Sequence, residues 1–167
     1  MNSFNDTPRG LVADANILID YYKSDKGILP ILSRQIATLY IPSPVLDEVQ
    51  QLSEKDAFDL GIVVVEPDLD QLFEAQEGDG PTSFQDRLCL VLAREEGWGI
   101  LTNDKALRKE CEDEGISCLW GLEAMAILVE GKCITSARAM ATAKKISQIN
   151  PFITDDILTR FQERLGR

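Results

Sequence analysis

Short apolar segments alternate with amphipathic helical segments through residues 11–120, and this alternation limits the possible folds more than any other feature. Five almost entirely apolar segments read as strands: LVADA (11–15), LYIP (39–42), IVVVE (62–66), GILT (99–102) and ISCLW (116–120). Helical periodicity marks the stretches near 16–24, 28–37, 44–54, 69–77, 84–97 and 104–114. Strands that are apolar on both faces are typical of a parallel sheet covered by helices on both sides. The pattern predicts an α/β fold, a three-layer α/β/α sandwich with a central parallel sheet of about five strands.

The remainder of the chain, residues 121–167, shows helical patterns only. They are GLEAMAILVEG, SARAMATAKKI and, after Asn150 and Pro151, TDDILTRFQERL. A length of 167 residues fits one domain with a sizeable core. We therefore expect an α/β domain over residues 1–120 and a helical C-terminal extension over 121–167, packed on the same domain.

Composition excludes several classes of protein and of catalytic site. There is no histidine, so Ser-His-Asp and Cys-His arrangements and imidazole bases are excluded. The four cysteines have no CxxC spacing and are expected to be reduced core residues rather than zinc ligands. No apolar run approaches the ~20 residues of a membrane span, and the N-terminus has no signal-peptide pattern. Cytoplasmic residence without membrane attachment is the resulting expectation.

The charge is distributed unevenly. The net charge of −11 argues against a simple nucleic-acid binder. Residues 132–167, however, have a local balance of +4, which leaves −15 for residues 1–131. The basic side chains of this tail are Lys132, Arg138, Lys144, Lys145, Arg160, Arg164 and Arg167. Such a tail could bring a polyanion to an acidic, metal-filled site, or it could simply be the solvated face of two helices.

One charged residue, Asp14, lies inside the apolar run GLVADANILID. A carboxylate buried without a partner costs roughly several kcal/mol. Ligands of open α/β sheets bind beyond the carboxyl ends of the strands, where Asp14 and Asn16 close the first predicted strand. Thr102, Asn103 and Asp104 close the strand GILT. These two segments should converge if their strands are neighbours.

Two further acids lie on predicted helices. Counting ~100° per residue along SPVLDEVQQL places Glu48 at the edge of the apolar stripe, half-buried, with Asp47 on the opposite side. The same count along SFQDRLCLVLAREEG places Asp86 among apolar residues. Taken singly, Asp86 could complement a helix dipole, Glu48 could be a solvated stripe-edge residue, and Asp104 could simply begin a helix. Four packed carboxylates would repel one another, and a hard divalent cation such as Mg²⁺ or Mn²⁺ would remove that repulsion.

At these residues the chain resembles the PIN-domain nuclease family. That family has an aspartate at the end of its first strand, often in a D-x-N motif, which Asp14 and Asn16 match in VADANILID. It has an acid on a following helix, matched by Glu48, and an aspartate that opens a later helix, matched by Asp86. Its last motif is a strand ending in T-N-D, which Thr102, Asn103 and Asp104 match in the stretch ILTNDKALRK. The resemblance covers roughly residues 10–120, and the C-terminal helices are similar to those of a PIN subgroup.

This resemblance implies a PIN-like catalytic domain and a metal-dependent endoribonuclease. One or two Mg²⁺ or Mn²⁺ ions would be held by four acids: Asp14, Glu48, Asp86 and Asp104. Three neighbours would orient these ligands or contact a phosphate: Asn16, Thr102 and Asn103. Lys105 is a further candidate phosphate contact or a solvent-facing lysine. Many bacterial relatives are toxins of toxin–antitoxin pairs, so RNA, a small antitoxin protein and a second copy in a homodimer are the implied partners.

Two other functions remain open at this point. An aspartyl phosphotransferase of the haloacid-dehalogenase type would use Asp14 as nucleophile. Such enzymes need D-x-D after the first strand, whereas this chain has D-A-N at residues 14–16. A non-catalytic PIN-like module that binds a protein partner is the other alternative. The presence of all four acids favours the nuclease.

Overall fold

The central sheet has five parallel strands, as the sequence predicts. The computed structural model describes residues 8–166. The strands are β1 (Gly10–Ala13), β2 (Thr38–Pro42), β3 (Ile62–Val65), β4 (Gly99–Leu101) and β5 (Cys118–Leu119). Their order is β3-β2-β1-β4-β5, and every neighbouring pair is parallel. Because β1 and β2 are buried on both faces, the apolar strand pattern reflects helices on both sides.

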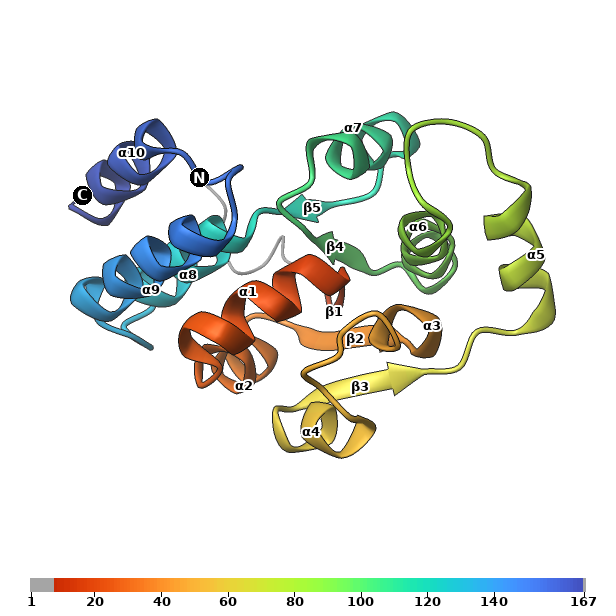
Figure 1. Ribbon diagram of the computed structural model, residues 1–167, viewed down its shortest axis with the longest axis horizontal. Helices are drawn as coiled ribbons and strands as arrows, with labels where there is room; N and C mark the ends of the chain where they lie inside the picture. Colours follow the sequence, from red (N-terminus) through yellow and green to blue (C-terminus); the bar gives the residue numbers. More distant parts are fainter. Residues whose placement is uncertain (1–7, 167) are drawn as a thin grey trace.

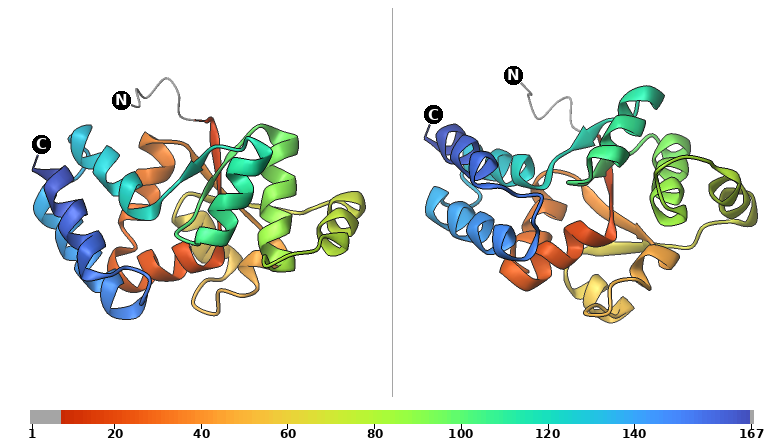
Figure 2. Two further views of the ribbon diagram at one scale, coloured as in Figure 1. Left: turned by 90° about the horizontal axis from the view of Figure 1, so that it is seen from above. Right: turned by 45° about the horizontal axis from the view of Figure 1, so that its top comes forward.

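Helices cover both faces of the sheet and extend beyond one end of it. Figure 1 shows α6 and α7 on one side of the sheet and α1, α2 and α4 on the other. Figure 2 shows α8, α9 and α10 together at one end of the molecule, with α5 at the opposite end. The α/β/α sandwich is therefore confirmed. The helices of the described residues are α1 (Ala15–Asp25), α2 (Ile28–Gln35), α3 (Ser43–Leu46), α4 (Glu54–Asp59), α5 (Leu69–Glu77), α6 (Phe84–Glu96), α7 (Lys105–Glu114), α8 (Gly121–Glu130), α9 (Ser136–Ile149) and α10 (Asp155–Leu165).

The expected helix over residues 44–54 is wrong, because the chain forms two short helices there. α3 ends at Leu46, and a turn leads to α4. Ser53 caps α4: its hydroxyl accepts from the Asp56 N–H at 3.1 Å, and the Asp56 carboxylate accepts from the Ser53 N–H at 3.0 Å. This reciprocal capping box fixes a new helix start where a continuous helix would have placed Ser53 in its interior.

The C-terminal helices share the hydrophobic core of the α/β layers. Met125 of α8, Ala139 of α9 and Phe161 of α10 belong to the same buried cluster as Leu18 and Tyr21 of α1. The hydroxyl of Tyr21 donates to the Gly121 carbonyl at 2.6 Å and ties α1 to the start of α8. Residues 121–166 therefore pack as one unit with the sheet.

The chain reverses its direction across the sheet between β1 and β4. From β1 it proceeds to β2 and β3 on one side, then crosses to β4 and β5 on the other. The carboxyl ends of β1 and β4 thus flank the crevice where open α/β sheets bind ligands. Separately, none of the helices within residues 8–166 is long and apolar enough to span a membrane.

Candidate functional site

Asp14 lies at the carboxyl end of β1 and begins α1. Its side chain is only 4% exposed. One carboxylate oxygen accepts from the Ile17 N–H at 2.8 Å, and the other accepts a short bond from the Thr102 hydroxyl. The partners of Asp14 are therefore a helix N–H and a hydroxyl from the neighbouring strand. Because a carboxylate has about four acceptor positions, these two bonds leave capacity for a cation.

Thr102 links the ends of β4 and β1. It is 1% exposed, and its hydroxyl donates to Asp14 while accepting from the Asp104 N–H at 3.0 Å. The Asp104 carboxylate begins α7 by accepting from the Ala106 and Leu107 N–H groups at 2.8 and 3.1 Å, both on Oδ1. Oδ2 of Asp104 accepts no hydrogen bond from the residues described. The Thr102 hydroxyl thus fixes the orientation of the Asp14 carboxylate. Because both helix N–H groups bond Oδ1 of Asp104, its Oδ2 is available to a ligand.

Asp86 lies half-buried in the first turn of α6. The Ser83 hydroxyl caps this helix by accepting from the Asp86 N–H at 3.1 Å. Burial raises the pKa of Asp86, and the charge of Asp104 raises it further. A raised pKa means that the ionised carboxylate is disfavoured in the folded chain. Asp86 therefore lies where the charge of Asp104 reaches it.

Glu48 is exposed, so the sequence-based expectation of a half-buried side chain is wrong. The helix that placed it at a stripe edge ends at Leu46, and in the segment that follows Val49 and Leu52 are buried while Glu48 is not. Partial desolvation nevertheless raises the pKa of Glu48, and the negative charge of Asp86 adds to this shift. Glu48 therefore lies at the mouth of the acidic group rather than inside it.

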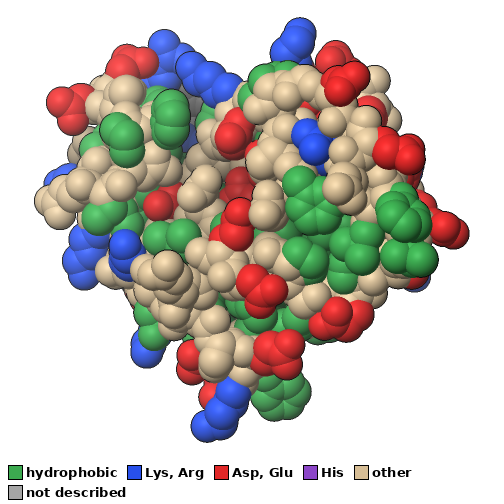
Figure 3. Space-filling view, turned by 45° about the vertical axis from the view of Figure 1, so that its right-hand side comes forward, with side chains coloured by type: hydrophobic (Ala, Val, Ile, Leu, Met, Phe, Trp, Pro, Cys, Tyr) green, Lys and Arg blue, Asp and Glu red, His purple; other side chains and the backbone are tan. Residues whose placement is uncertain are grey.

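The acids interact through their charges. Burial raises the pKa of Asp14 to about 7, and the charges of Asp86 and Asp104 contribute in the same direction against the hydrogen bonds from Thr102 and Ile17. We call the region bounded by Asp14, Glu48, Asp86 and Asp104 the acidic recess. Figure 3 shows red side chains in and around a hollow near the centre of the face it presents. Like charges that raise one another's pKa favour proton uptake or a bound cation.

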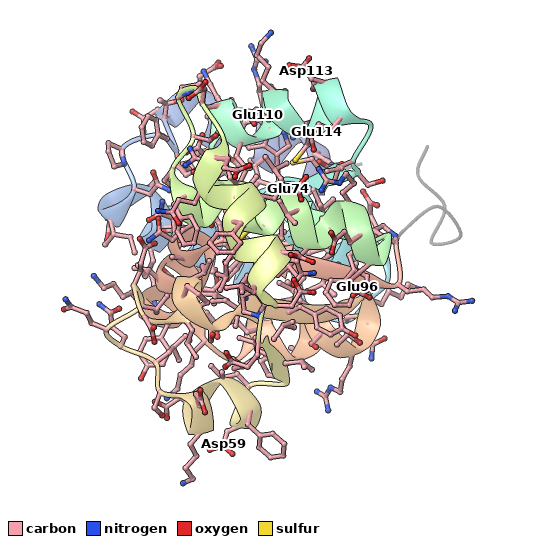
Figure 4. All side chains as sticks on the ribbon, turned by 90° about the vertical axis from the view of Figure 1, so that its right-hand side faces the viewer. Asp59, Glu74, Glu96, Glu110, Asp113 and Glu114 are labelled. Carbon is pink, nitrogen blue, oxygen red and sulfur yellow. The ribbon has the colours of Figure 1, made fainter. Side chains whose placement is uncertain are left out.

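Two residues near the recess were not anticipated from the sequence. Glu110 of α7 accepts from the Thr82 hydroxyl at 3.0 Å, and its charge raises the pKa of Asp86. Figure 4 shows Glu110 on α7 together with Asp113 and Glu114, far from Asp59 on α4. A helical count of ~100° per residue places Glu110 about 120° around α7 from Asp104, so periodicity alone gave no signal for it.

The second unanticipated residue is Cys89, one turn after Asp86. It is fully buried, and the pKa of its thiol is raised by burial and by the charges of Asp14, Asp86 and Glu48. A raised pKa disfavours the thiolate form of Cys89, which is the form that binds metals. All four cysteines are free thiols: Cys89, Cys111, Cys118 and Cys133.

The recess suits a hard divalent cation by its donor chemistry. All its acidic ligands are carboxylate oxygens, which Mg²⁺ and Mn²⁺ prefer. Within residues 8–166, however, no three acidic or cysteine side chains stand close enough together to form a ready-made metal site. Mutually repelling carboxylates are expected to stand apart. The four acids therefore match a divalent cation in their charge and in the oxygen atoms that they offer.

Asn16 and Asn103 lie beside the recess rather than within it. Asn16 is exposed on the first turn of α1. The side-chain oxygen of Asn103 accepts from the Gly121 N–H at 3.0 Å, and its amide also stabilises the carboxylate of Asp20. A Cβ at Gly121 would lie 2.8 Å from the end of the Ile17 side chain and 3.2 Å from the Asn103 amide, so a larger residue here would have to displace them. Asn103 and Asn16 both line a second cavity, described below.

The basic tail is partly neutralised by ion pairs. Arg138 pairs with Asp25 at 2.7 Å, and Arg160 pairs with Asp156 at 3.1 Å. Arg164 lies 3.4 Å from Glu130. Lys144 and Lys145 are exposed on α9, and Arg167 lies outside the described residues. The acids that pair with Arg138 and Arg164 lie outside residues 132–167, so these two pairs leave the tail less positive than its own sequence indicates.

A scan of the chain against protein-family models and a search among curated proteins each found no match. The geometry of the site is therefore the basis of the functional argument.

Proposed function

We propose that this protein is a metal-dependent endoribonuclease that hydrolyses phosphodiester bonds at the acidic recess. The observation that carries the proposal is the electrostatic coupling of the acids at the crevice between β1 and β4. The pKa values of Asp14, Glu48 and Asp86 are all raised, and in each case another recess acid contributes. Because the chain has no histidine, a metal ion held there would have carboxylates rather than imidazoles as its charged ligands.

Asp14, Glu48, Asp86 and Asp104 would hold one or two Mg²⁺ or Mn²⁺ ions. Such an ion would lower the pKa of a bound water molecule toward neutrality. It would also stabilise the charge that develops on the phosphate oxygens. The hydroxyl of Thr102 holds the Asp14 carboxylate in place, and the Asp104 N–H holds that hydroxyl. The proposed hydrolysis therefore needs no histidine side chain as a base.

RNA as the substrate and a toxin–antitoxin role extend the resemblance of the sequence to the PIN family. The same applies to a small antitoxin partner and a homodimer. These are proposals that the assays below test separately from metal dependence. The haloacid-dehalogenase alternative makes a different prediction, because only that reaction would leave a phosphorylated Asp14.

The deciding experiment incubates the purified protein with single-stranded and structured RNAs, in Mg²⁺, in Mn²⁺ and in chelator. We expect internal cleavage with either metal and none in chelator. An Asp14→Asn preparation made in parallel controls for contaminating nucleases. Equal cleavage in chelator, equal cleavage by the variant, or no cleavage of any nucleic acid with metal present would overturn the proposal.

A further inference from the structure

A second cavity adjoins the acidic recess. It has a volume of about 450 Å³ and lies between α1, the residues that connect β4 to α7, and the turn that follows α9. That volume lies within the ~300–1,000 Å³ typical of small-molecule sites. Asp104 lines this cavity and also belongs to the recess. We call it the side cavity.

The polar part of the side cavity is centred on Asp20, which is 5% exposed. Oδ2 of Asp20 accepts from the Asn150 side-chain amide at 2.9 Å. Burial raises the pKa of Asp20, and hydrogen bonds from the Asn150 and Asn103 amides partly offset that rise. Asn16, one turn earlier on α1, lines the same cavity. Since each carboxylate oxygen has two lone pairs, the amide partners leave Asp20 able to accept further hydrogen bonds from a ligand.

The apolar part of the side cavity includes an exposed aromatic ring. Phe152 is 73% exposed, and Ile149 beside it is 45% exposed. The turn is held by Asn150, whose side-chain oxygen accepts from the Phe152 N–H at 3.0 Å while its amide donates to Asp20. One side chain thus ties the backbone of Phe152 to the Asp20 carboxylate. An exposed ring beside buried hydrogen-bonding groups is how proteins bind unstacked bases.

We propose that the side cavity binds a nucleobase next to the cleaved phosphate and prefers guanine, an inference that rests on the proposed ribonuclease function. Guanine presents two adjacent N–H donors on its Watson–Crick edge, at N1 and N2. Adenine, cytosine and uracil place an acceptor beside every donor on that edge. A carboxylate accepts both guanine donors at once, so Asp20 favours guanine, while Phe152 stacks on the base. Asp104 is common to both sites and places the adjoining phosphate at the recess.

The test measures binding of guanosine, adenosine, cytidine and uridine in chelator, by protein-observed NMR with the side-chain amide signals of Asn103 and Asn150 as reporters. Nucleosides carry no phosphate and the buffer no metal, so the result does not depend on cleavage. We expect guanosine to bind about tenfold more tightly than the others, since a good bidentate contact discriminates by at least that factor. Equal binding of all four, or guanosine shifts that miss both asparagines, would overturn the proposal.

Two variants test the assigned residues. Asp20→Asn should reduce the preference for guanosine to about twofold or less, because an amide offers one donor and one acceptor. Phe152→Ala should weaken all nucleosides by about tenfold, through lost stacking. Phe58→Ala is the matched control, since Phe58 is 79% exposed on α4, away from the side cavity. Because Phe152 is exposed, its replacement leaves the core intact, and an unchanged affinity would overturn the proposal even if Asp20→Asn failed to fold.

Cleavage mapping separates this inference from the proposed function. Selective guanosine binding without cleavage of any RNA would support the side cavity and overturn the ribonuclease. Metal-dependent cleavage with no base preference in either the parent or Asp20→Asn would do the reverse. Cleavage next to guanines that becomes indiscriminate in Asp20→Asn would support both.

Discussion

The acidic recess and the side cavity lie on either side of one extended segment, residues 102–104, yet they treat a buried carboxylate differently. In the recess, Asp14 accepts from a hydroxyl and a helix N–H and also feels the charges of other acids. In the side cavity, burial also raises the pKa of Asp20, but the amides of Asn150 and Asn103 partly offset this rise and no other acid within residues 8–166 adds to it. The recess therefore concentrates charge that a cation can neutralise, whereas the side cavity offers directional hydrogen bonds. The acidic recess therefore suits catalysis, and the side cavity suits discrimination between ligands.

Removing a recess carboxylate should have the largest effect. Asp14→Asn should lower metal-dependent cleavage by about three orders of magnitude, since a lost ligand removes several kcal/mol of transition-state stabilisation. Asp113→Asn is the control, because Asp113 is an exposed acid further along α7. Initial rates on one RNA at saturating Mg²⁺ measure both. An active Asp14→Asn protein would show that the charge of the recess has no catalytic role.

Relief of repulsion should be visible as stability. In chelator, Asp86→Asn should leave the melting temperature unchanged or raise it, although a typical substitution at a half-buried position costs ~1 kcal/mol. Added Mg²⁺ should stabilise the parent by mass action and the variant much less.

Asp70→Asn is the matched control for Asp86→Asn, since Asp70 is an exposed acid in the first turn of α5. Its replacement should cost about 0.3–1 kcal/mol through the helix dipole alone, with and without Mg²⁺. Thermal melts of the three proteins decide the matter. Destabilisation of Asp86→Asn in chelator together with full activity would remove Asp86 from the recess chemistry.

A lysine between the two sites tests whether one ligand spans them. Lys105 is exposed and lines the side cavity next to Asp104. If it contacts a phosphate, Lys105→Ala should weaken RNA binding and reduce the slope of log affinity against log salt by about one unit. Lys109→Ala, also exposed and one turn further along α7, should leave the slope unchanged. Equal slopes for both variants would show that bound RNA does not contact Lys105 at the side cavity.

The smallest expected effect concerns an ion pair remote from both sites. Asp25 of α1 accepts from Arg138 of α9 at 2.7 and 3.1 Å, and these bonds hold the pKa of Asp25 below its usual 3.8. A lowered folded-state pKa stabilises the chain above pH 3.8, and this contribution is lost as the pH falls through the folded value. Arg138→Gln should therefore cost at most ~1 kcal/mol near pH 7 and less in acid.

Urea unfolding at several pH values measures this difference. Arg160→Gln provides the comparison, because its pair with Asp156 lies within one turn of α10 and both side chains are more than two thirds exposed, at 77% and 72%. We expect no measurable change for Arg160→Gln at any pH. An Arg138→Gln cost that grows in acid would contradict the assignment.

Local sequence patterns determined the layers of this fold and the places where its acids begin. Strands that are apolar throughout predicted a parallel sheet covered on both faces, because side-chain periodicity is a local property. Asp14 and Asp104 could be located from the sequence, since Asp14 directly follows β1 and Asp104 lies three residues beyond the end of β4. The half-buried position of Asp86 agrees with the helical count that placed it among apolar residues.

Tertiary structure decided what those counts could not reach. Glu48 is exposed because α3 ends before it, at Leu46. The next helix, α4, begins only after the capping box at Ser53. The bond between Asp20 and Asn150 joins residues 130 positions apart, and that between Glu110 and Thr82 joins residues 28 apart. No periodicity encodes such pairs, because they depend on how helices pack across the sheet. The sequence by itself therefore determined the acidic edge, and only the packing of α1 against the turn after α9 created the side cavity beside it.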